Sequence, residues 1–509
     1  MNESMPSAAA VSTRQLDEFN ALYRMFDVQG NGRLTRPQTD EALQVLGLGL
    51  SDQDRQKLLD AVDAAGEITQ SAFIDWLCQR TDFDLDHEMR LLFSLMDTSG
   101  DGLVSCDEML MLARCLDPDL SETALEVLIA SHDTDGDRMI SFDDFMAMQQ
   151  SGGHLQVTIA GIRRFRKLLG RYALAARIPR IALVEVDSDL GAGRAGAGDG
   201  IALLRQSALQ RALATRTTTL QGRRPGRDKQ GLYSTTPHAR NIDAIRTLLE
   251  QTSALVCETL QQREFPVVLA GDHSTAAGTI AGIAKAFPDQ RLGVVWIDAH
   301  ADIHSPYTSL SGNMHGMPIA IAGRFDNADN AVNMPDEITL AHWEACKALG
   351  RQGRTNLDLR DLVYVSVRDT EPAEDAAIAM FGIPIFRTSD IRRLGPEAVA
   401  QACLDHLSEV DILYVSFDVD SMDAAICMGT GTPVAGGITA DEAARINRRL
   451  VSDPRVVCWE ICEINPALDL RNSTGQVSMM VYEETLDALQ WRLTTAAAIQ
   501  ARRDDFRGS

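Results

Sequence analysis

The chain has 509 residues, of which 45% are hydrophobic and 24% charged, a composition typical of a folded protein with two or three domains. Its net charge of −24 argues against nucleic acid and anionic membranes as partners, because both attract positively charged surfaces. With no apolar run of membrane-spanning length, no export signal and nine cysteines without CxxC spacing, we expect a cytoplasmic protein without disulfides.

Residues 1–150 are far more acidic than the rest of the chain. They hold 29 of the 72 acidic side chains but only 10 of the 48 basic ones, and they alternate helical patterns with loops rich in Asp, Gly and Ser. Metal cations are the natural partners of such a segment. Residues 97–108 match a twelve-residue EF-hand calcium loop, with Gly102 at the sharp turn. The expected ligands are Asp97, Ser99, Asp101, the Leu103 carbonyl, Ser105 and Glu108.

A second loop at residues 133–144 departs from the EF-hand pattern at two positions. Arg138 stands where glycine normally takes a positive φ, and Asp144 replaces the longer bidentate glutamate, so we expect weaker calcium binding or Mg²⁺. The expected ligands are Asp133, Asp135, Asp137, the Met139 carbonyl and Asp144. Residues 27–38 and 61–72 keep the spacing but few ligands. Four loops in two pairs resemble the calmodulin superfamily, which implies calcium in one or two of them.

A change of pattern follows residue 150. Residues 151–177 read as a linker and a connecting helix with apolar Phe165 and Leu168 among basic side chains. Calcium-bound EF-hand pairs open an apolar groove that binds basic amphipathic helices, so one expectation is that residues 1–150 bind this helix. The equally weighted alternative is that residues 1–150 form a purely structural domain. We predict that the remaining residues, 178–509, form a third part of the chain, and that residues 214–236 form a long loop.

From residue 178 onward, β-branched runs alternate with helix-like segments. Continuous apolar strands separated by helices predict an α/β fold with a parallel sheet covered on both faces. The expected strands are residues 181–186, 267–270, 294–297, 363–367, 412–417 and 456–461.

Three of these strands end in metal-binding side chains. Carboxylates and imidazoles at the carboxyl ends of parallel strands point into the crevice where such folds bind ligands. Clustered carboxylates cannot all stay ionised without a compensating cation, so their convergence predicts bound metal. The residues are His273, Asp298, His300, Asp302, Asp418 and Asp420.

Through these motifs, residues 178–500 resemble the ureohydrolase superfamily, which includes arginase, agmatinase, guanidinobutyrase and formiminoglutamase. The resemblance implies one ion on His273, Asp298, Asp302 and Asp418, and a second on His300, Asp298, Asp418 and Asp420. These ions are usually manganese, with nickel also accepted by such ligands, and they lower the pKa of the attacking water. The implied catalytic residues are His315, which shuttles a proton, Glu463, which orients the guanidinium, and Asp302.

The implied substrate contacts differ from the arginase pattern at two positions. Ser311, Asn313 and Thr432 match it, whereas His304 stands where arginases have Asn and Glu371 where they have Asp. A retained serine and acid favour an α-amino acid such as L-arginine or homoarginine, whose length or shape can differ from arginine. Guanidine, agmatine and guanidinobutyrate remain open as substrates.

Two other classes stay open as well. One is a calcium-binding regulatory protein with a vestigial hydrolase domain, although six intact ligands argue against it. The other is the related single-zinc deacetylase fold, which does not need Asp302 and Asp420 and which a metal count would distinguish. The family resemblance also implies a homo-oligomer, either a trimer or a hexamer.

Overall fold

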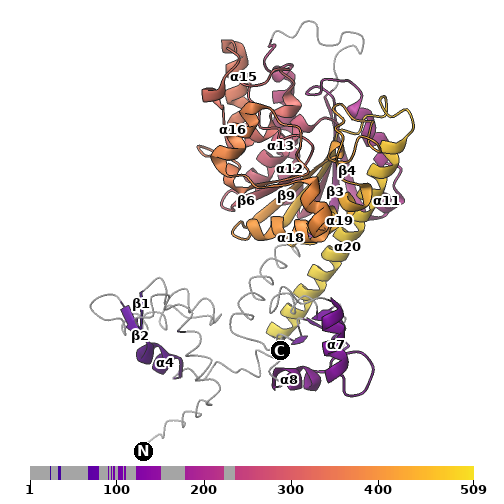
Figure 1. The fold of residues 1–509 in the computed structure, drawn as a ribbon. Helices are drawn as coiled ribbons and strands as arrows, with labels where there is room; N and C mark the ends of the chain where they lie inside the picture. The colour runs from indigo at the N-terminus through magenta and orange to yellow at the C-terminus, as the bar shows by residue number, and fades with distance from the viewer. Residues whose placement is uncertain are drawn as a thin grey trace, which may run out of the picture. The chain divides into compact units, whose positions relative to one another are not determined.

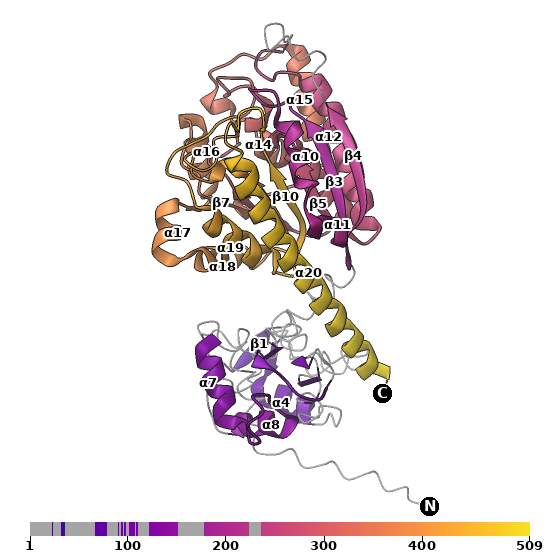
Figure 2. The ribbon, with the colours of Figure 1, turned by 90° about the vertical axis from the view of Figure 1, so that its right-hand side faces the viewer.

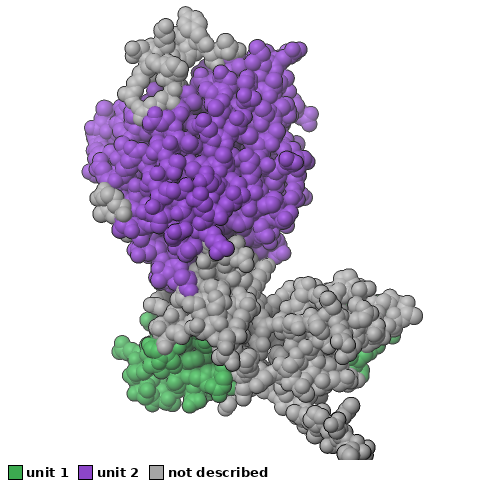
Figure 3. All heavy atoms as spheres, turned by 180° about the vertical axis from the view of Figure 1, so that it is seen from behind, with its two compact units in different colours: residues 1–170, 498–509 green, residues 171–497 purple. Residues whose placement is uncertain are grey.

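The computed structural model divides the chain into two compact units, which are described separately below. Unit 1 comprises residues 1–170 and 498–509, and unit 2 comprises residues 171–497 (Figure 3). The predicted boundaries at residues 150 and 177 stay predictions, because residues 151–177, with the expected connecting helix, lie outside the described part. The structure describes residues 23, 32–35, 67–78, 90, 93, 94, 96, 97, 101–106, 108, 109, 122–150, 178–222 and 236–508.

Unit 2 is built on an eight-stranded, wholly parallel sheet (Figure 1). Its strand order, β4-β3-β5-β10-β9-β6-β7-β8, requires crossovers, and the helices supply them. The central strands are buried along their whole length, as their continuous apolar sequences predict. The strands are β3 (Arg180–Ser188), β4 (Ala214–Gly222), β5 (Glu264–Ala270), β6 (Leu292–Ile297), β7 (Leu362–Val365), β8 (Ile385–Phe386), β9 (Ile412–Asp418) and β10 (Val456–Cys462).

Helices cover both faces of this sheet (Figure 2). The side chains of β10 show the alternation, because Trp459 donates to Asn447 of α19 and stacks on Tyr482 of α20, whereas Glu460 accepts from Thr279 of α13. Among the described residues, no helix is long and apolar enough to cross a bilayer. The helices are α10 (Ile201–Leu204), α11 (Ala208–Leu213), α12 (Ile242–Gln261), α13 (Ala276–Ala286), α14 (Pro318–Gly323), α15 (Glu337–Lys347), α16 (Pro372–Phe381), α17 (Thr388–Leu394), α18 (Pro396–His406), α19 (Ala440–Val451) and α20 (Ser473–Gly508).

The six predicted strands are confirmed, but the predicted loop at residues 214–236 is wrong over its first nine residues. Residues 214–222 form β4, which pairs with β3 alone and therefore lies at the edge of the sheet. Its side chains alternate between half-buried and exposed, and Thr215 donates to the carbonyl of Ile181 at 3.0 Å. Threonine favours strands, yet a polar edge strand lacks the apolar run that marked the others. Residues 223–235 lie outside the described part.

In unit 1, the described residues include one backbone pairing from each of the two predicted loop pairs. Strands β1 (Arg33–Thr35) and β2 (Glu67–Thr69) pair antiparallel, with Leu34 opposite Ile68. Val104 and Ile140 likewise exchange two backbone hydrogen bonds of 2.9 Å. These apolar residues occupy the eighth positions of their loops, as the EF-hand pattern predicts. The helices described are α4 (Gln70–Cys78), α7 (Glu122–His132) and α8 (Phe142–Gln150).

Candidate metal centre and substrate pocket

The six predicted metal ligands lie at one edge of the sheet in unit 2. Strand β5 leads into His273, β6 leads into Asp298, His300 and Asp302, and β9 ends at Asp418. Because all strands run parallel, their carboxyl ends meet at this edge. The fold therefore brings together side chains that lie up to almost 150 residues apart in the sequence.

His273 faces three of the carboxylates at once. Its Nδ1 atom lies 3.1 Å from Asp298 Oδ2 and 3.2 Å from both Asp302 Oδ2 and Asp418 Oδ2. Ligand atoms about 2.1 Å from one ion and at right angles around it stand roughly 3 Å apart, so these spacings suit a single divalent ion. The Nδ1 atom is buried and has no hydrogen-bond partner, which also fits a lone pair aimed at a metal.

A second group adjoins the first through Asp298. His300 Nδ1 lies 3.4 Å from Asp298 Oδ1 and 3.1 Å from Asp420 Oδ2. The two oxygens of Asp298 thus face two different imidazoles, which is the geometry of a ligand that bridges two ions. Asp418 turns Oδ2 toward His273, while its Oδ1 accepts from the backbone N–H of Asp420 at 2.8 Å. That Asp418 also bridges therefore stays a prediction.

Neighbouring side chains hold His273 in this orientation. Its Nε2 atom lies 2.7 Å from the Ser416 hydroxyl, which can accept from an Nε2–H and so leave the Nδ1 lone pair for a metal. The ring stacks on Trp296, with centroids 4.0 Å apart, and the Trp296 N–H donates to Asp298 Oδ2 at 3.0 Å. The packed sheet therefore fixes the ligands before any ion binds.

The charges in this cluster oppose one another unless a cation joins them. Burial and the neighbouring Asp298 raise the pKa of Asp302 to about 6. Burial and the charges of Asp420 and Asp298 raise the pKa of Asp418 well above its usual value. Burial acts the same way on Asp298, but the adjacent imidazoles of His273 and His300 hold its pKa well below the ordinary range. Carboxyls that resist ionisation when buried together gain most from a divalent cation.

His315 and Glu463 form a pair beside the cluster. His315 Nδ1 lies 3.1 Å from Glu463 Oε1, which also accepts from the backbone N–H of His273 at 3.0 Å. Burial lowers the pKa of His315, but Glu463 outweighs burial and raises it to about 9. Glu463 Oε2 is buried without a partner, and both Glu463 and Asp302 adopt positive φ angles of 64° and 51°. Such backbone strain is frequent at functional sites.

The first calcium loop of unit 1 has the turn that its sequence predicts. Gly102 has a φ of 85°, and its N–H donates to Asp97 Oδ2 at 2.9 Å. Glu108 at the twelfth position accepts from the backbone and hydroxyl of Ser105. Ser99 lies outside the described residues, so its place in the predicted ligand set stays a prediction.

In the second calcium loop, three predicted ligands converge. Carboxylate oxygens of Asp133, Asp135 and Asp137 all lie within 4.8 Å of one another. Arg138 has a φ of 64°, as its position predicts, and its N–H donates to Asp133 Oδ2 at 2.7 Å. Asp144 is instead hydrogen-bonded to the hydroxyls of Thr134 and Ser141, both at 2.6 Å. Asp144 is not part of the group of three carboxylates, and weaker calcium binding at this loop stays a prediction.

A family model described as "Arginase family" matches residues 179–486, more than half of the chain. The chain belongs to the arginase family. A second model, described as an EF-hand domain pair, matches residues 86–150. Membership makes unit 2 a hydrolase of a metal-dependent family, and the EF-hand pair is a type of module that binds calcium.

Named relatives agree with this assignment. The chain is 29% identical to the arginase of Bacillus subtilis strain 168 over 306 residues, which cover 60% of this chain and 97% of that protein. It is 35% identical to the arginase of Bacillus caldovelox over 243 residues, covering 47% and 74%. The solved structure of the native Bacillus caldovelox arginase at pH 5.6 matches with a TM-score of 0.52 and 30% identity, covering 60% of this chain and 98% of that one.

The predicted substrate contacts of this arginase-family unit occupy two places. Thr432 donates to Asp420 Oδ2 at 3.1 Å, so it lies against the metal centre. His304 Nε2 lies 3.5 Å from Glu371 Oε2, so the two predicted departures from the arginase pattern lie next to each other. Ser311 is exposed and accepts from the backbone N–H of Asn313 at 3.1 Å, on the loop that leads to His315. Burial lowers the pKa of His304 to about 4, so its imidazole is neutral near pH 7.

Arg368 is a structural residue of this site that the sequence reading missed. Its guanidinium donates to the carbonyls of Asp420 and Val434 at 2.9 and 2.8 Å, and further to those of Ser366, Ser421, Met422 and Ala435. One planar cation thus ties together the loop that carries the ligand Asp420 and the contact Thr432. The only available signal was the pair Arg368-Asp369 shortly after β7.

Glu374 and Asp369 were also missed. Glu374 is 4% exposed, and its oxygens accept from the N–H groups of Ile303 and Glu371, which join α16 to the metal-ligand loop. Burial raises the pKa of Glu374 to about 8. Asp369 Oδ2 lies 3.7 Å from His300 Nε2, the ring nitrogen on the side away from the centre. The spacing Glu-Pro-Ala-Glu, a capping box, was the available signal for Glu374.

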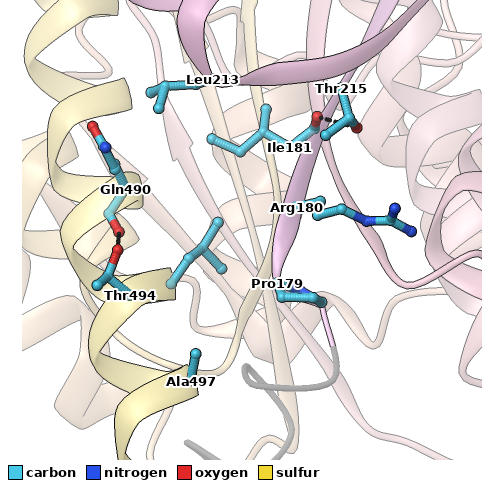
Figure 4. Close-up of a pocket in the computed structure, with 9 residues that line it drawn as sticks. Pro179, Arg180, Ile181, Leu213, Thr215, Gln490, Thr494 and Ala497 are labelled. Atoms are coloured by element: carbon cyan, nitrogen blue, oxygen red, sulfur yellow. Dashed lines mark hydrogen bonds between the residues drawn. The ribbon is translucent and has the colours of Figure 1, made fainter.

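A hollow of about 350 Å³ lies elsewhere in unit 2 (Figure 4). It stands at the start of β3, the opposite end of the strand from the metal centre, with Arg180 and Ile181 on one side and Gln490 and Thr494 of α20 on the other. None of the predicted site residues lines it, so it is separate from the predicted chemistry.

Proposed function

We propose that this protein hydrolyses the guanidino group of an α-amino acid such as L-arginine or homoarginine, releasing urea and an amine, with two divalent ions. The observation that carries the proposal is Asp298, whose two oxygens face His273 and His300. A bridging carboxylate between two ligand groups is what a two-metal hydrolase requires, and a single-metal site does not.

The residues fit a pair of manganese or nickel ions. His273, Asp302 and Asp418 would hold one ion, His300 and Asp420 would hold the other, and Asp298 would contribute to both. When bound, such ions supply a Lewis acid and lower the pKa of a water to near neutrality. Imidazole and carboxylate ligands of this kind accept both metals.

Three residues then act on the substrate. Glu463, with its Oε2 unpartnered, accepts hydrogen bonds from the guanidinium and orients its carbon. Asp302 accepts a hydrogen bond from the attacking water. His315, held protonated by Glu463, gives a proton to the departing amine nitrogen as the carbon–nitrogen bond breaks.

The head of the substrate meets the loop from Ser311 to His315 and the start of α16. Ser311, Asn313 and His304 supply donors for an α-carboxylate, and Glu371 accepts from an α-ammonium. A site that pairs both head groups rejects analogues lacking them, since its own polar groups are left unpaired. This is why an amino acid is preferred over agmatine or guanidine.

Unit 1 binds calcium in the loop at residues 97–108, and more weakly in the loop at residues 133–144. We propose two roles for it of equal standing: a sensor that modulates hydrolysis or assembly, and a loaded structural module. Calcium titration of activity, oligomer size and melting temperature separates them, because only a sensor changes kcat, KM or oligomer size.

A screen of urea release tests the main proposal. Arginine, homoarginine, agmatine, guanidinobutyrate and guanidine are offered in turn, with manganese and with nickel, and metal content is measured in parallel. We expect two transition-metal ions per chain and the highest kcat/KM for an amino acid. A higher kcat/KM for agmatine or guanidine than for every amino acid would refute the substrate assignment, and one ion per chain would refute the two-metal centre.

A further inference from the structure

Strand β10 ends at the edge of the sheet that carries the metal centre, but it supplies none of the six predicted ligands. It lies between β5, which leads into His273, and β9, which ends at Asp418. Its last residue is Cys462, which pairs with Asp418 in parallel register. Paired residues of neighbouring strands turn their side chains to the same face of a sheet. The Cys462 side chain therefore lies on the same face, and at the same edge, as the predicted ligand Asp418.

The Cys462 thiol lies close to two of the predicted ligands. Its Sγ atom, a ring nitrogen of His273 and a carboxylate oxygen of Asp418 are all within 4.8 Å of one another, and none of these residues is more than 3% exposed. The ligand atoms of a tetrahedral zinc ion lie about 2.0 to 2.3 Å from the metal, and so roughly 3.5 Å apart. One ion can therefore reach all three residues after small movements of their side chains.

Weak partners surround the atoms that this ion would bind. Within the described residues, His273 Nδ1 is buried without a hydrogen-bond partner. Cys462 Sγ lies 3.8 Å from the carbonyl oxygen of Phe417, a weak contact that a metal ion can replace. Buried cysteines usually pack as small apolar side chains. Cys462 differs, because an imidazole and a carboxylate lie beside it.

The end of β10 is also fastened to the segment that carries His273. The backbone N–H of Glu463 donates to the carbonyl of Gly271 at 2.8 Å, and Glu463 Oε1 accepts from the N–H of His273 at 3.0 Å. These bonds fix the position of Cys462 relative to its neighbours, so the three residues are brought together before any ion binds.

A thiolate changes which ions this place prefers. Sulfur ligands favour zinc, whereas manganese prefers carboxylate and water oxygens. Three protein ligands to zinc leave its fourth position open to water. Asp298 and Asp302 complete the ligand set proposed for manganese or nickel, and Cys462 completes a set for zinc. Because His273 and Asp418 belong to both sets, the two modes of binding exclude each other.

We infer that Cys462 is a further metal ligand of this protein, and that zinc binds to His273, Asp418 and Cys462 in place of the ion proposed for catalysis. The inference rests on the proposed metal centre. The thiol gives its proton to the solvent when it binds the ion. Zinc should therefore inhibit urea release, and an excess of manganese should reverse the inhibition, because both ions need His273 and Asp418.

Cobalt(II) serves as a spectroscopic probe of the thiol. A cobalt–thiolate bond adds a charge-transfer band in the near ultraviolet that oxygen and nitrogen ligands do not give. The full chain, freed of transition metal, is titrated with cobalt in excess calcium, which keeps the loops of unit 1 filled with calcium. We expect the band in wild type and in Cys458→Ser, and its loss in Cys462→Ser. Cys458 is the matched control, since it is equally buried on the same strand but pairs with Tyr414.

Zinc affinity gives a second measurement. Zinc and manganese binding to the full chain is measured by equilibrium dialysis, again in excess calcium. Cys462→Ser should bind zinc at least about 10-fold more weakly than wild type, with a smaller change for manganese, since losing a group that supports a metal costs about 10- to 100-fold in affinity. The zinc concentration that halves urea release by the manganese-loaded protein should rise by a similar factor.

The outcomes separate the inference from the function it rests on. Absence of the band from cobalt-bound wild type, a band that Cys462→Ser retains, or equal losses of zinc and manganese affinity in that variant would overturn the inference. Urea release by the manganese-loaded wild type then leaves the proposed function standing. A wild type that shows the thiolate band but releases no urea from any guanidino compound overturns the proposed function and leaves Cys462 as a metal ligand.

Discussion

The two proposed metal-binding regions of this protein are built in opposite ways. The centre of unit 2 draws its ligands from three strands, between His273 and Asp420, whereas each calcium loop of unit 1 takes all of its ligands from twelve consecutive residues. The first depends on a completed sheet, and the second on a local turn with Gly102 or Arg138 at positive φ. Metal binding by unit 2 would thus depend on the whole fold, and metal binding by unit 1 on a loop.

Burial separates the two regions further. Asp298 and Asp420 are almost wholly buried, while Asp135 and Asp137 are exposed. Removing one carboxylate from a buried cluster leaves the charges of the cluster uncompensated, since the remaining charged groups keep their desolvation cost. An exposed loop loses only one of several oxygen ligands.

The change with the largest expected effect removes Asp418, a ligand that is predicted to serve both ions. In Asp418→Ala we expect urea release to fall by at least about 10³-fold and bound transition metal to drop, because the loss affects the charge balance of the whole cluster. Calcium binding by unit 1 should not change. Asp405→Ala, an exposed change on α18, is the control. More than a few per cent activity with two metals bound would show that the ligand set is wrong.

Replacing Arg368, which holds the loop that carries Asp420, should have the next largest effect on activity. Arg368→Lys keeps a positive charge but cannot reach six carbonyls, so we expect kcat/KM to fall by about 10- to 100-fold, as for other partners that orient metal ligands. Manganese affinity, measured by equilibrium dialysis, should fall with it. Arg360→Lys, on an exposed arginine, controls for the substitution. An unchanged manganese affinity would mean that Arg368 does not position Asp420.

The two regions should also differ in their response to pH. Glu463 holds the pKa of His315 at about 9, above its usual 6.5, so protonated His315 stabilises the fold below about 6.5 and this contribution is lost as pH rises through 9. Activity should fall over the same alkaline range, and Glu463→Gln should move that fall to lower pH. Backbone and hydroxyl donors keep the pKa of Asp133 and Asp144 low, so calcium binding should stay level between pH 6 and 9. A flat activity profile through pH 9 would exclude His315 as the proton donor.

Calcium should act on unit 1 alone if its role is structural. At a hundred times the dissociation constant, a bound ion stabilises the folded state by about 2.7 kcal/mol. We therefore expect a higher melting temperature with calcium in wild type and little change in the variant combining Asp97→Ala with Glu108→Gln. A calcium-dependent kcat in wild type that this variant lacks would favour the sensor role instead.

The smallest expected effect concerns Arg138. A non-glycine residue at positive φ costs about 1 kcal/mol, so Arg138→Gly should tighten calcium binding at residues 133–144 by roughly 5-fold. Titration calorimetry measures it, with Arg360→Gly, at an exposed arginine of unit 2, as the control. Equal affinities would show that the short Asp144, not the strained turn, limits this site.

The sequence was sufficient to predict a site wherever its ligands lie close together along the chain. Asp298, His300 and Asp302 follow an apolar strand within five positions, and Asp97 to Glu108 spell out a loop, so their surroundings were predictable. The buried strands were predictable for the same reason, because their apolar runs have no other use in a folded chain.

What the sequence could not indicate depends on distant partners. In the sequence, Arg368 cannot be distinguished from a surface arginine, because its partners lie in the distant loop at residues 420–435. Glu374 likewise resembles an ordinary first-turn helix residue, because its contact with Ile303 joins distant parts of the chain. β4 was missed because an edge strand does not need the continuous apolar run that identified the buried strands. The contact of His304 with Glu371 joins residues that no spacing rule connects.

The stacking of Trp296 on His273 gives the metal centre a built-in optical signal. The indole ring lies 4.0 Å from the imidazole of one ligand and donates to another, so a paramagnetic manganese ion held there should quench its emission strongly. Trp491, with 57% of its surface exposed, should emit at longer wavelength than Trp296, and Trp491→Phe would remove its contribution to the signal. Loading of the centre can then be followed by tryptophan fluorescence in the absence of any guanidino compound.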